Sequence, residues 1–373
     1  MRLVTMSKSF TYDGAQYVGG HKYVMAEESE RIIAGMSGAV EKSVPIDPFY
    51  LQYKGEALDG KTLLTWRTGG NGDMLMLIPA LQWLKKKYPT MRLIVATACP
   101  APLEKHPAID RLIRVPFDSL ELGGADYHAM YEGLLEGGSK EAATQSAVDL
   151  YMRALSIDPS GVPRADKLPK IYASEPEEKW YLAETARLFK PEDVVVGIQI
   201  EASSPVRKYP EGKLIAITQI LVGEGAKVVI IGGPDQSEKY KHYCEKTPPG
   251  TVIDGTKYTI RKSIVLAKRY DLIIAPDSMM VQVGAAYETP TIGQYGPFHS
   301  STRMKYHSAG IGLDARVVCS PCCVHDFRPC VKGFPSPCFT RISVKDVLES
   351  ADYLLYPKIN RHFRCLVPEV LRA

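Results

Sequence analysis

Asp73 is the residue whose type and position most clearly suggest chemistry in this sequence. It follows an apolar run at 62–66 (TLLTW) and a turn that contains Gly69, Gly70 and Gly72, and an amphipathic stretch comes after it. Glycines permit a tight turn, and backbone N–H groups at a helix N-terminus carry a partial positive charge that favours anions. The pattern therefore predicts a strand, a turn and a helix with Asp73 in its first turn. A carboxylate in that place either caps the helix or exchanges a proton with a bound ligand.

Two common phosphate-binding motifs are excluded at this turn. A dinucleotide-binding fingerprint needs a third glycine three residues after Gly72 and an acidic residue at the end of the next strand, and the sequence has neither. A P-loop needs Lys followed by Ser or Thr after its last glycine, whereas this chain has Asp73 and Met74 there. The turn is thus predicted to serve another kind of site.

Length and composition predict a globular protein with two ordinary domains. The chain has 373 residues, of which 45% are hydrophobic and 24% charged. A net charge of +4 is too small to predict nucleic-acid or membrane binding. No apolar run reaches the roughly 18 residues of a membrane span, and the first residues lack the apolar core of a secretory signal, so we expect a cytoplasmic protein with no transmembrane segment.

The first 45 residues differ in pattern from the rest of the chain. Short alternating runs surround turns at 13–14 and 19–20, and a short helical stretch follows, which predicts a small appended β-rich module at 1–45. Its YDG turn resembles small modules in phage-associated proteins. Residues 44–48 (VPIDP) are predicted to be a linker.

From residue 61 onward, apolar strands alternate with helical patterns, and this alternation restarts at 194–200 (VVVGIQI). Such an alternation predicts two successive α/β domains with parallel sheets, at 46–185 and 186–345. A helical tail at 346–373 is predicted to pack back on the cleft between them. Ligands of such sheets bind beyond the carboxyl ends of the strands.

Four segments, in order along the chain, carry a resemblance to a known family. They are TGGNGDMLMLIPALQWLKKKYP at 68–89, EASSPVRKYP at 201–210, VVIIGGPDQ at 228–236 and IIAPDSMMVQVGAAYETPTIGQYGP at 273–297. Together they resemble glycosyltransferase family 9, the ADP-heptose:lipopolysaccharide heptosyltransferases and their relatives, over about residues 60–350. The resemblance implies the GT-B fold, in which two Rossmann-like domains face a cleft. It places the acceptor on the first domain and the nucleotide sugar on the second.

The resemblance also implies roles for individual residues. Asp73 would be the general base of an inverting transfer, and Arg207 and Lys208 would stabilise the leaving diphosphate, so that catalysis needs no cofactor. The chain departs from the family pattern at Met279 and Gln282, where the family has Gly and His, and this leaves the donor sugar open. The residues expected to bind the donor are Gly70, Gly72, Ser203, Ser204, Arg207, Lys208, Gly232, Gly233, Asp277, Ser278, Gln282 and Gly296.

Five of the eight cysteines fall between residues 319 and 338. Cys319, Cys322, Cys330 and Cys338 are predicted to form a structural tetrahedral thiolate site for zinc or iron, because a Cys-x-x-Cys pair is the usual chelating half of such sites. Free buried thiols are the alternative.

The resemblance implies a glycosyltransferase that moves a heptose-like sugar or another hexose from a nucleotide-diphosphate sugar to an acceptor hydroxyl. A glycan, a protein and modified DNA stay open as acceptors, and oligomerisation is also left open. Two alternatives remain. A sugar-nucleotide epimerase or hydrolase would consume donor without acceptor, and a non-catalytic glycan-binding or assembly component would keep its function when Asp73 is replaced by Asn.

Overall fold

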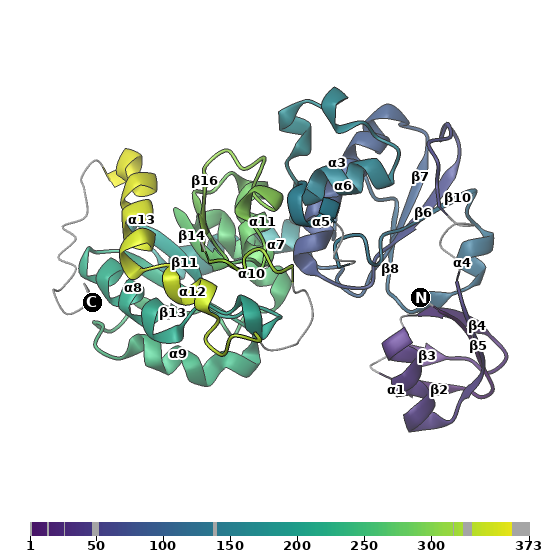
Figure 1. The fold of residues 1–373 in the computed structure, drawn as a ribbon, viewed down its shortest axis with the longest axis horizontal. Coiled ribbons are helices and arrows are strands. Elements are labelled where there is room, and N and C mark those ends of the chain that lie inside the picture. Colours follow the sequence, from purple (N-terminus) through teal and green to yellow (C-terminus); the bar gives the residue numbers. More distant parts are fainter. Residues whose placement is uncertain are drawn as a thin grey trace. The chain divides into compact units, whose positions relative to one another are not determined.

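The structure is a computed structural model that describes residues 2–12, 15–25, 27–46, 52–136, 140–315, 317–323 and 330–359. The chain forms two compact units (Figure 1). The first unit comprises residues 1–134 and 149–166, and the second comprises residues 135–148 and 167–373. The division into four domains that the sequence predicts stays a prediction.

The first unit contains a four-stranded parallel sheet with the order β10-β6-β7-β8. Its strands are β6 (Thr62–Trp66), β7 (Arg92–Ala96), β8 (Arg111–Ile113) and β10 (Tyr127–Met130). The helices of this part are α3 (Asn71–Lys87), α4 (Leu120–Gly123) and α6 (Ala147–Ala154). β6 comes first in the chain and lies between β7 and β10, so the strand order reverses beside it. Open α/β sheets bind ligands at such a switch point.

The predicted β-rich module is confirmed, and a strand from outside it completes its sheet. The module consists of β1 (Arg2–Met6), β2 (Phe10–Tyr12), β3 (Ala15–Tyr17), β4 (Lys22–Met25), α1 (Glu27–Ser37) and β5 (Val40–Pro45). The short strand β9 (Phe117–Asp118), which follows β8, pairs antiparallel with β4, so that the sheet order is β5-β1-β4-β9. The module is therefore joined to the α/β part through its sheet. Residues 44 and 45 of the predicted linker belong to β5, and residues 47 and 48 lie outside the described residues.

The module and the parallel sheet also share a hydrophobic core. Val24 of β4 packs in one buried cluster with Trp66 of β6 and Phe117 of β9. The rings of Trp66 and Phe117 meet edge to face with their centroids 5.9 Å apart. Aromatic burial of this kind dominates core energetics, so the module and the sheet stabilise each other.

The second unit is built on a six-stranded parallel sheet with the order β13-β12-β11-β14-β15-β16. Its strands are β11 (Val195–Gln199), β12 (Lys227–Ile231), β13 (Val252–Asp254), β14 (Leu272–Pro276), β15 (Thr291–Tyr295) and β16 (Gly310–Asp314). Its helices are α5 (Lys140–Thr144), α7 (Glu175–Leu188), α8 (Glu211–Gly223), α9 (Ser237–Cys244), α10 (Ile260–Leu266), α11 (Met279–Tyr287), α12 (Pro337–Arg341) and α13 (Val344–Ile359). Numbered within the unit, the order is 3-2-1-4-5-6, which is the Rossmann order, with its switch point between β11 and β14.

The last described helix, α13, packs on this sheet beside α8 (Figure 1). Its buried residues in the core of the second unit are Val344, Val347, Leu348, Ala351 and Leu355. Residues 360–373 of the predicted tail lie outside the described residues. Among the described residues, no helix is long and apolar enough to cross a membrane.

Candidate active site

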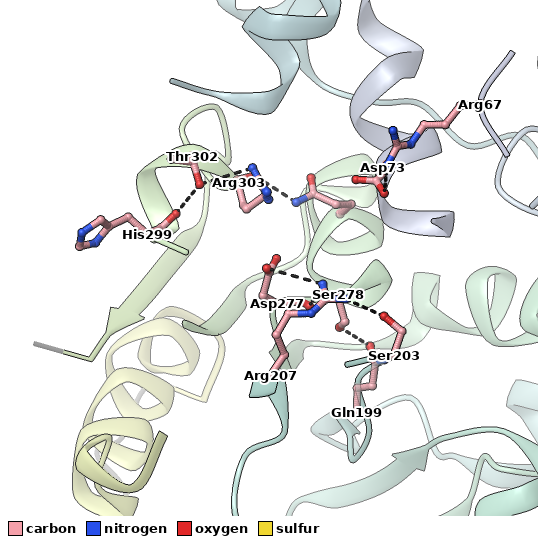
Figure 2. Close-up of polar contacts among 11 residues, drawn as sticks. Arg67, Asp73, Gln199, Ser203, Arg207, Asp277, Ser278, His299, Thr302 and Arg303 are labelled. Atoms are coloured by element: carbon pink, nitrogen blue, oxygen red, sulfur yellow. Dashed lines mark hydrogen bonds and ion pairs between the residues drawn. The ribbon is translucent and has the colours of Figure 1, made fainter. Parts of the chain in front are cut away.

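The first candidate centre lies at the end of β6, in the first unit. Arg67 directly follows β6 and is buried, with 3% of its side chain exposed, and its Nη2 lies 2.9 Å from Oδ2 of Asp73. Its Nη1 donates a hydrogen bond of 3.0 Å to the backbone oxygen of Tyr131, the residue that follows β10. The guanidinium group therefore spans the switch point of this sheet and holds Asp73 there (Figure 2).

The backbone of Gly70 makes room for the carboxylate of Asp73. Gly70 has a φ of +88°, and a Cβ on it would lie 2.0 Å from Oδ2 of Asp73. Only glycine satisfies both conditions without strain. Gly72, the other glycine of this turn that is predicted to bind the donor, is the second residue of α3, also in the first unit.

The helix-capping alternative for Asp73 is not realised among the described residues. The N-cap of α3 is Gly70, which has no side chain to cap with, and the hydrogen bond of Asp73 goes to Arg67 instead. That bond occupies Oδ2, and no described residue donates to Oδ1. With 14% of its side chain exposed, the carboxylate keeps one oxygen available to a ligand.

A second carboxylate lies at the same sheet edge and was missed by the sequence reasoning. Glu132, two residues after β10, accepts a hydrogen bond of 2.5 Å from the backbone N–H of Thr68. It ties the turn after β6 to the loop after β10. The signal available in the sequence is an acidic residue shortly after the segment YHAM. This segment is only weakly apolar, so the sequence pattern does not define where the strand ends.

The second candidate centre lies at the switch point of the second unit. Arg207 ends a short 3-10 turn that follows β11, and its Nη2 donates a hydrogen bond of 2.6 Å to Oγ of Ser203. Its Nη1 donates a bond of 3.1 Å to the backbone oxygen of Asp277, just beyond β14, and lies 3.7 Å from Oδ2 of that residue (Figure 2). The structure thus brings together three predicted donor-binding residues from two neighbouring strand ends.

Ser278 is linked to β11 rather than used as a helix cap. It is the N-cap residue of α11, but its hydroxyl makes no capping bond and instead donates a hydrogen bond of 2.6 Å to Oε1 of Gln199. The same oxygen accepts from the backbone N–H of Met280 at 3.3 Å. Gln199, the last residue of β11, therefore fixes the loop that carries Asp277. The sequence reasoning missed Gln199, although a polar residue at the end of a buried apolar strand was the available signal.

Lys208 differs from Arg207 because its ammonium group already has a strong partner. It lies 2.5 Å from Oε2 of Glu201, and Lys239 pairs with the other oxygen of the same carboxylate. Burial acts to raise the pKa of Glu201, but hydrogen bonds from the two lysines hold that pKa below its usual value. The sequence reasoning did not single out Glu201, because nothing in the pattern shows which lysine it meets.

Of four other predicted donor-binding residues, two are half-buried and two are buried: Gly232 and Gly233 are half-buried, and Ser204 and Gln282 are buried. A Cβ on Gly232 would come within 2.7 Å of Oε1 of Gln236, and the backbone N–H of Gly233 donates a 2.7 Å bond to that same oxygen. The hydroxyl-bearing Ser204 is buried, with 1% exposed. The amide of Gln282 donates a bond of 3.0 Å to the backbone oxygen of Arg303, so this side chain stabilises the protein interior.

The four cysteines predicted to bind a metal line one cavity of about 350 Å³ in the second unit, but they are not grouped as ligands. Within the part of the chain that the structure describes, no three side chains of His, Cys, Asp or Glu lie close enough to hold a metal ion. Burial, together with Cys322 and Cys330 nearby, raises the pKa of Cys338 to about 11, so this thiol is protonated at neutral pH. The residues as placed do not fit the predicted zinc or iron site. The cavity is lined by Val206, Gly296, Pro297, Cys319, Cys322, Cys330 and Cys338, among others.

The cysteine-bearing segment contacts the loop that follows β15. Oγ of Ser320 donates a hydrogen bond of 2.5 Å to the oxygen of Gly296, and the N–H of Cys323 donates one of 2.8 Å to the oxygen of Pro297. A Cβ on Gly296 would lie 2.5 Å from Sγ of Cys338. Gly296 therefore serves close packing on the cysteine cavity.

A comparison with protein families identifies the fold and the class of chemistry. The model of glycosyltransferase family 9 (heptosyltransferase) matches residues 136–326, just over half of the chain. The chain belongs to glycosyltransferase family 9. It is accordingly a glycosyltransferase that uses a nucleotide-sugar donor. The matched range includes Arg207 and Asp277 but does not reach Asp73.

Solved structures of family 9 proteins have the same fold. A family 9 glycosyltransferase from Veillonella parvula is 18% identical, with a TM-score of 0.65 over 82% of this chain and 100% of that chain. ADP-heptose lps heptosyltransferase II from E. coli is 17% identical, with a TM-score of 0.60 over 80% of this chain and 99% of that chain. These likenesses confirm the predicted GT-B fold. No curated protein matches this chain.

A third solved structure is similar over more of the chain. The iron-containing dodecameric glycosyltransferase TibC from enterotoxigenic E. coli is 14% identical, with a TM-score of 0.59 over 95% of this chain and 93% of that chain. Because the N-terminal module makes up more than 5% of this chain, a match that covers 95% of the chain must include residues of that module. The likeness in fold therefore includes part of that module as well as the two α/β sheets.

Proposed function

We propose that this glycosyltransferase transfers a sugar by a single displacement with inversion, with Asp73 as general base. One observation carries the proposal. Asp73 lies at a switch point, where α/β sheets bind ligands, and it is held through Oδ2 so that Oδ1 is available. A carboxylate within hydrogen-bond reach of a hydroxyl can accept its proton, and such transfer typically contributes about 10²–10⁴-fold to the rate.

In the proposed reaction, the acceptor hydroxyl oxygen forms a bond to the anomeric carbon while the bond from that carbon to the diphosphate oxygen breaks. The hydroxyl proton passes to Asp73, and the bonding electrons leave with the diphosphate. Because the acceptor attacks from the face opposite the leaving group, the anomeric configuration inverts. A departing diphosphate gains negative charge, which fixed cationic donors stabilise.

Arg207 is the cation proposed to bind the diphosphate. Its side chain is 13% exposed, and its position is fixed by Ser203 and the backbone of Asp277. Guanidinium groups bind phosphate oxygens through paired N–H donors. Lys208 contributes less in this proposal, because Glu201 already neutralises it.

The donor proposed is ADP-heptose or a closely similar nucleotide sugar. The family description supports heptose transfer, and a crystal complex of TibC is described with ADP-D-beta-D-heptose. We propose residues 46–185 as the acceptor domain and 186–345 as the nucleotide-sugar domain. A glycan such as lipopolysaccharide core is the proposed acceptor. Protein and modified DNA, like the phage-associated character of the module, stay predictions with no support from the comparisons.

Metal binding and oligomer formation enter the proposal only through TibC, which is described as iron-containing and dodecameric. In this chain, four cysteines surround one cavity but lie too far apart to act as ligands where they are placed. Metal analysis of the purified protein tests this point. Stoichiometric zinc or iron would establish a bound metal, and a metal-free active protein would remove it from the proposal.

The test of the function is turnover of ADP-heptose with heptose-deficient lipopolysaccharide core. The wild-type protein is expected to release ADP and to yield a glycosylated product of inverted configuration. Asp73→Asn is expected to lower kcat by about 10²–10⁴-fold while donor affinity is kept. Release of ADP at the same rate without acceptor would favour a hydrolase or epimerase, and full turnover by the Asn variant would overturn the role of Asp73.

A further inference from the structure

Arg67 is a buried cation in contact with the proposed base, and its two terminal nitrogens have different partners. Nη1 donates to the backbone oxygen of Tyr131 at 3.0 Å, and Nη2 donates to Oδ2 of Asp73 at 2.9 Å. Because the guanidinium group is planar, fixing one nitrogen on a backbone oxygen fixes the direction of the other. The protein backbone therefore determines where Oδ2 of Asp73 lies.

This arrangement restricts the rotation of the Asp73 carboxylate. The terminal torsion of an aspartate is broad, so an unheld carboxylate samples many orientations. Arg67 holds one oxygen, and the absence of a Cβ on Gly70 makes room for this orientation, since a Cβ there would lie 2.0 Å from Oδ2. The second oxygen is consequently presented in one direction.

We propose that Arg67 is a positioning residue that orients Asp73 for proton transfer. The inference rests on the proposed function of Asp73 and adds to it the residue that orients the Asp73 carboxylate. Reacting groups must be held within fractions of an ångström, and a misplacement of about 1 Å costs about 10²-fold in rate. Lysine at this position could reach only one partner at a time with comparable geometry.

The alternative is that Arg67 only braces β6 against the loop after β10. A brace contributes to the stability of the first unit and does not act through Asp73. Arg67→Met keeps a long side chain of similar reach, but removing one partner of a buried ion pair leaves an uncompensated charge and is destabilising in either role. Kinetics with and without the Asp73 carboxylate therefore separate the two roles, because only positioning acts through that carboxylate.

The decisive experiment is a double-mutant cycle in the ADP-release assay with ADP-heptose and heptose-deficient lipopolysaccharide core. Arg67→Met is expected to lower kcat by about 10²-fold without changing KM for ADP-heptose. In the Asp73→Asn background, Arg67→Met is expected to have no further effect, because the group that it positions is gone. A full kcat in Arg67→Met, or losses that multiply in the double variant, would overturn the inference.

A rescue experiment gives a second readout. Added guanidinium is expected to restore part of the activity of Arg67→Ala and none of that of Asp73→Asn, and Arg67→Lys is expected to lie between the wild type and Arg67→Met. An Arg67→Ala protein that is folded, inactive and unresponsive to guanidinium would count against positioning. The Asp73→Asn control separates the two proposals, since its retained activity would overturn the base itself, whereas its loss together with an active Arg67→Met would overturn only the role of Arg67.

Discussion

Each unit carries an arginine–aspartate pair in which the arginine occupies a matching place, and the pairs differ in which partner is the more exposed. Each arginine follows the first strand of its sheet, and each donates from Nη1 to a backbone oxygen beyond the fourth strand, at 3.0 Å from Arg67 to Tyr131 and at 3.1 Å from Arg207 to Asp277. In the first unit, Arg67 is 3% exposed and Asp73 14%. In the second, Arg207 is 13% exposed and Asp277 8%.

The difference indicates which group each pair offers to a ligand. The same bridge across a switch point presents a carboxylate in the first unit and a guanidinium group in the second. A general base and a phosphate-binding cation are the two groups that the proposed transfer requires. The charged groups are 2.9 Å apart in the first pair and 3.7 Å apart in the second. The longer distance in the second pair means that Asp277 holds the guanidinium group of Arg207 less tightly.

The largest expected effect is on stability, and it tests whether the two units unfold independently. Phe117→Ala removes a buried ring from the core that the module shares with the first sheet and is expected to destabilise the first unit by about 3–5 kcal/mol. The second unit should unfold as before, which denaturant titration with probes in each unit would show. Leu120→Ala is the matched control, because its side chain is 75% exposed. Equal losses in both units would mean that the two pairs cannot be compared as independent sites.

The next prediction concerns the turn beneath the first pair. Gly70→Ala places a Cβ against Asp73 and strains a φ of +88°, so kcat for ADP release is expected to fall by about 10²-fold. Gly69→Ala is the control, because a Cβ there meets nothing within 4 Å. If Gly70→Ala and Gly69→Ala have the same kcat for ADP release, the orientation of Asp73 does not limit the reaction.

A smaller effect is expected for donor binding at the second pair. Arg207→Met removes charge-assisted hydrogen bonds worth about 1.5–3 kcal/mol, which corresponds to a rise of about 10- to 100-fold in the Kd for ADP-heptose. Lys208→Met is expected to change that Kd less, because Glu201 holds this lysine. Calorimetric titration measures both. A larger loss in the lysine variant would reverse the assignment of the two cations.

The smallest expected effect is on the pH dependence of stability. It concerns a third pair, Arg261 and Glu177 of the second unit, in which both partners contribute to stability and neither is proposed to bind a ligand. The hydrogen bond from Arg261, 2.7 Å from Nε to Oε1, is the main cause that lowers the pKa of Glu177 to about 2. A carboxylate with a lowered pKa in the folded state contributes stability above its usual pKa, here 4.5, and that contribution is lost as the pH falls through about 2.

The free energy of unfolding of the second unit is therefore expected to fall between pH 4.5 and about 2, and Glu177→Gln should remove part of that dependence. Denaturant unfolding across this pH range measures the difference between the two proteins. Turnover of the Gln variant at neutral pH should match the wild type. An unchanged pH dependence would show that the pair adds nothing to stability.

Much of the fold could be predicted because long apolar runs mark the central strands. The runs at 62–66 and 194–200 became β6 and β11, and the groups at their ends, Asp73 and Arg207, lie at the switch points. In parallel sheets buried on both faces, strands read as continuous apolar stretches, and the residues that follow them reach one edge. These features depend on local sequence.

The partners of the predicted site residues could not be predicted. Whether Asp73 meets Arg67 depends on the left-handed backbone of Gly70, and whether Lys208 meets Glu201 depends on the path of the loop after β11. The pairing of β9 with β4 was also missed, because two residues have no periodicity to recognise and their partner lies far away in the sequence. The spacing of the cysteines suggested ligands, but spacing does not fix how far apart the sulfur atoms lie.

The pairing of β4 with β9 has a consequence for synthesis on the ribosome. Tyr23 of β4 pairs with Asp118 of β9, which is synthesised about 95 residues later, so this edge of β4 stays unpaired until then. At a translation rate of about 5–20 residues per second, that edge stays open for roughly 5–20 seconds in each nascent chain. Uncovered strand edges pair readily with one another. The edge of β4 is therefore the stretch where a chaperone would protect the growing chain.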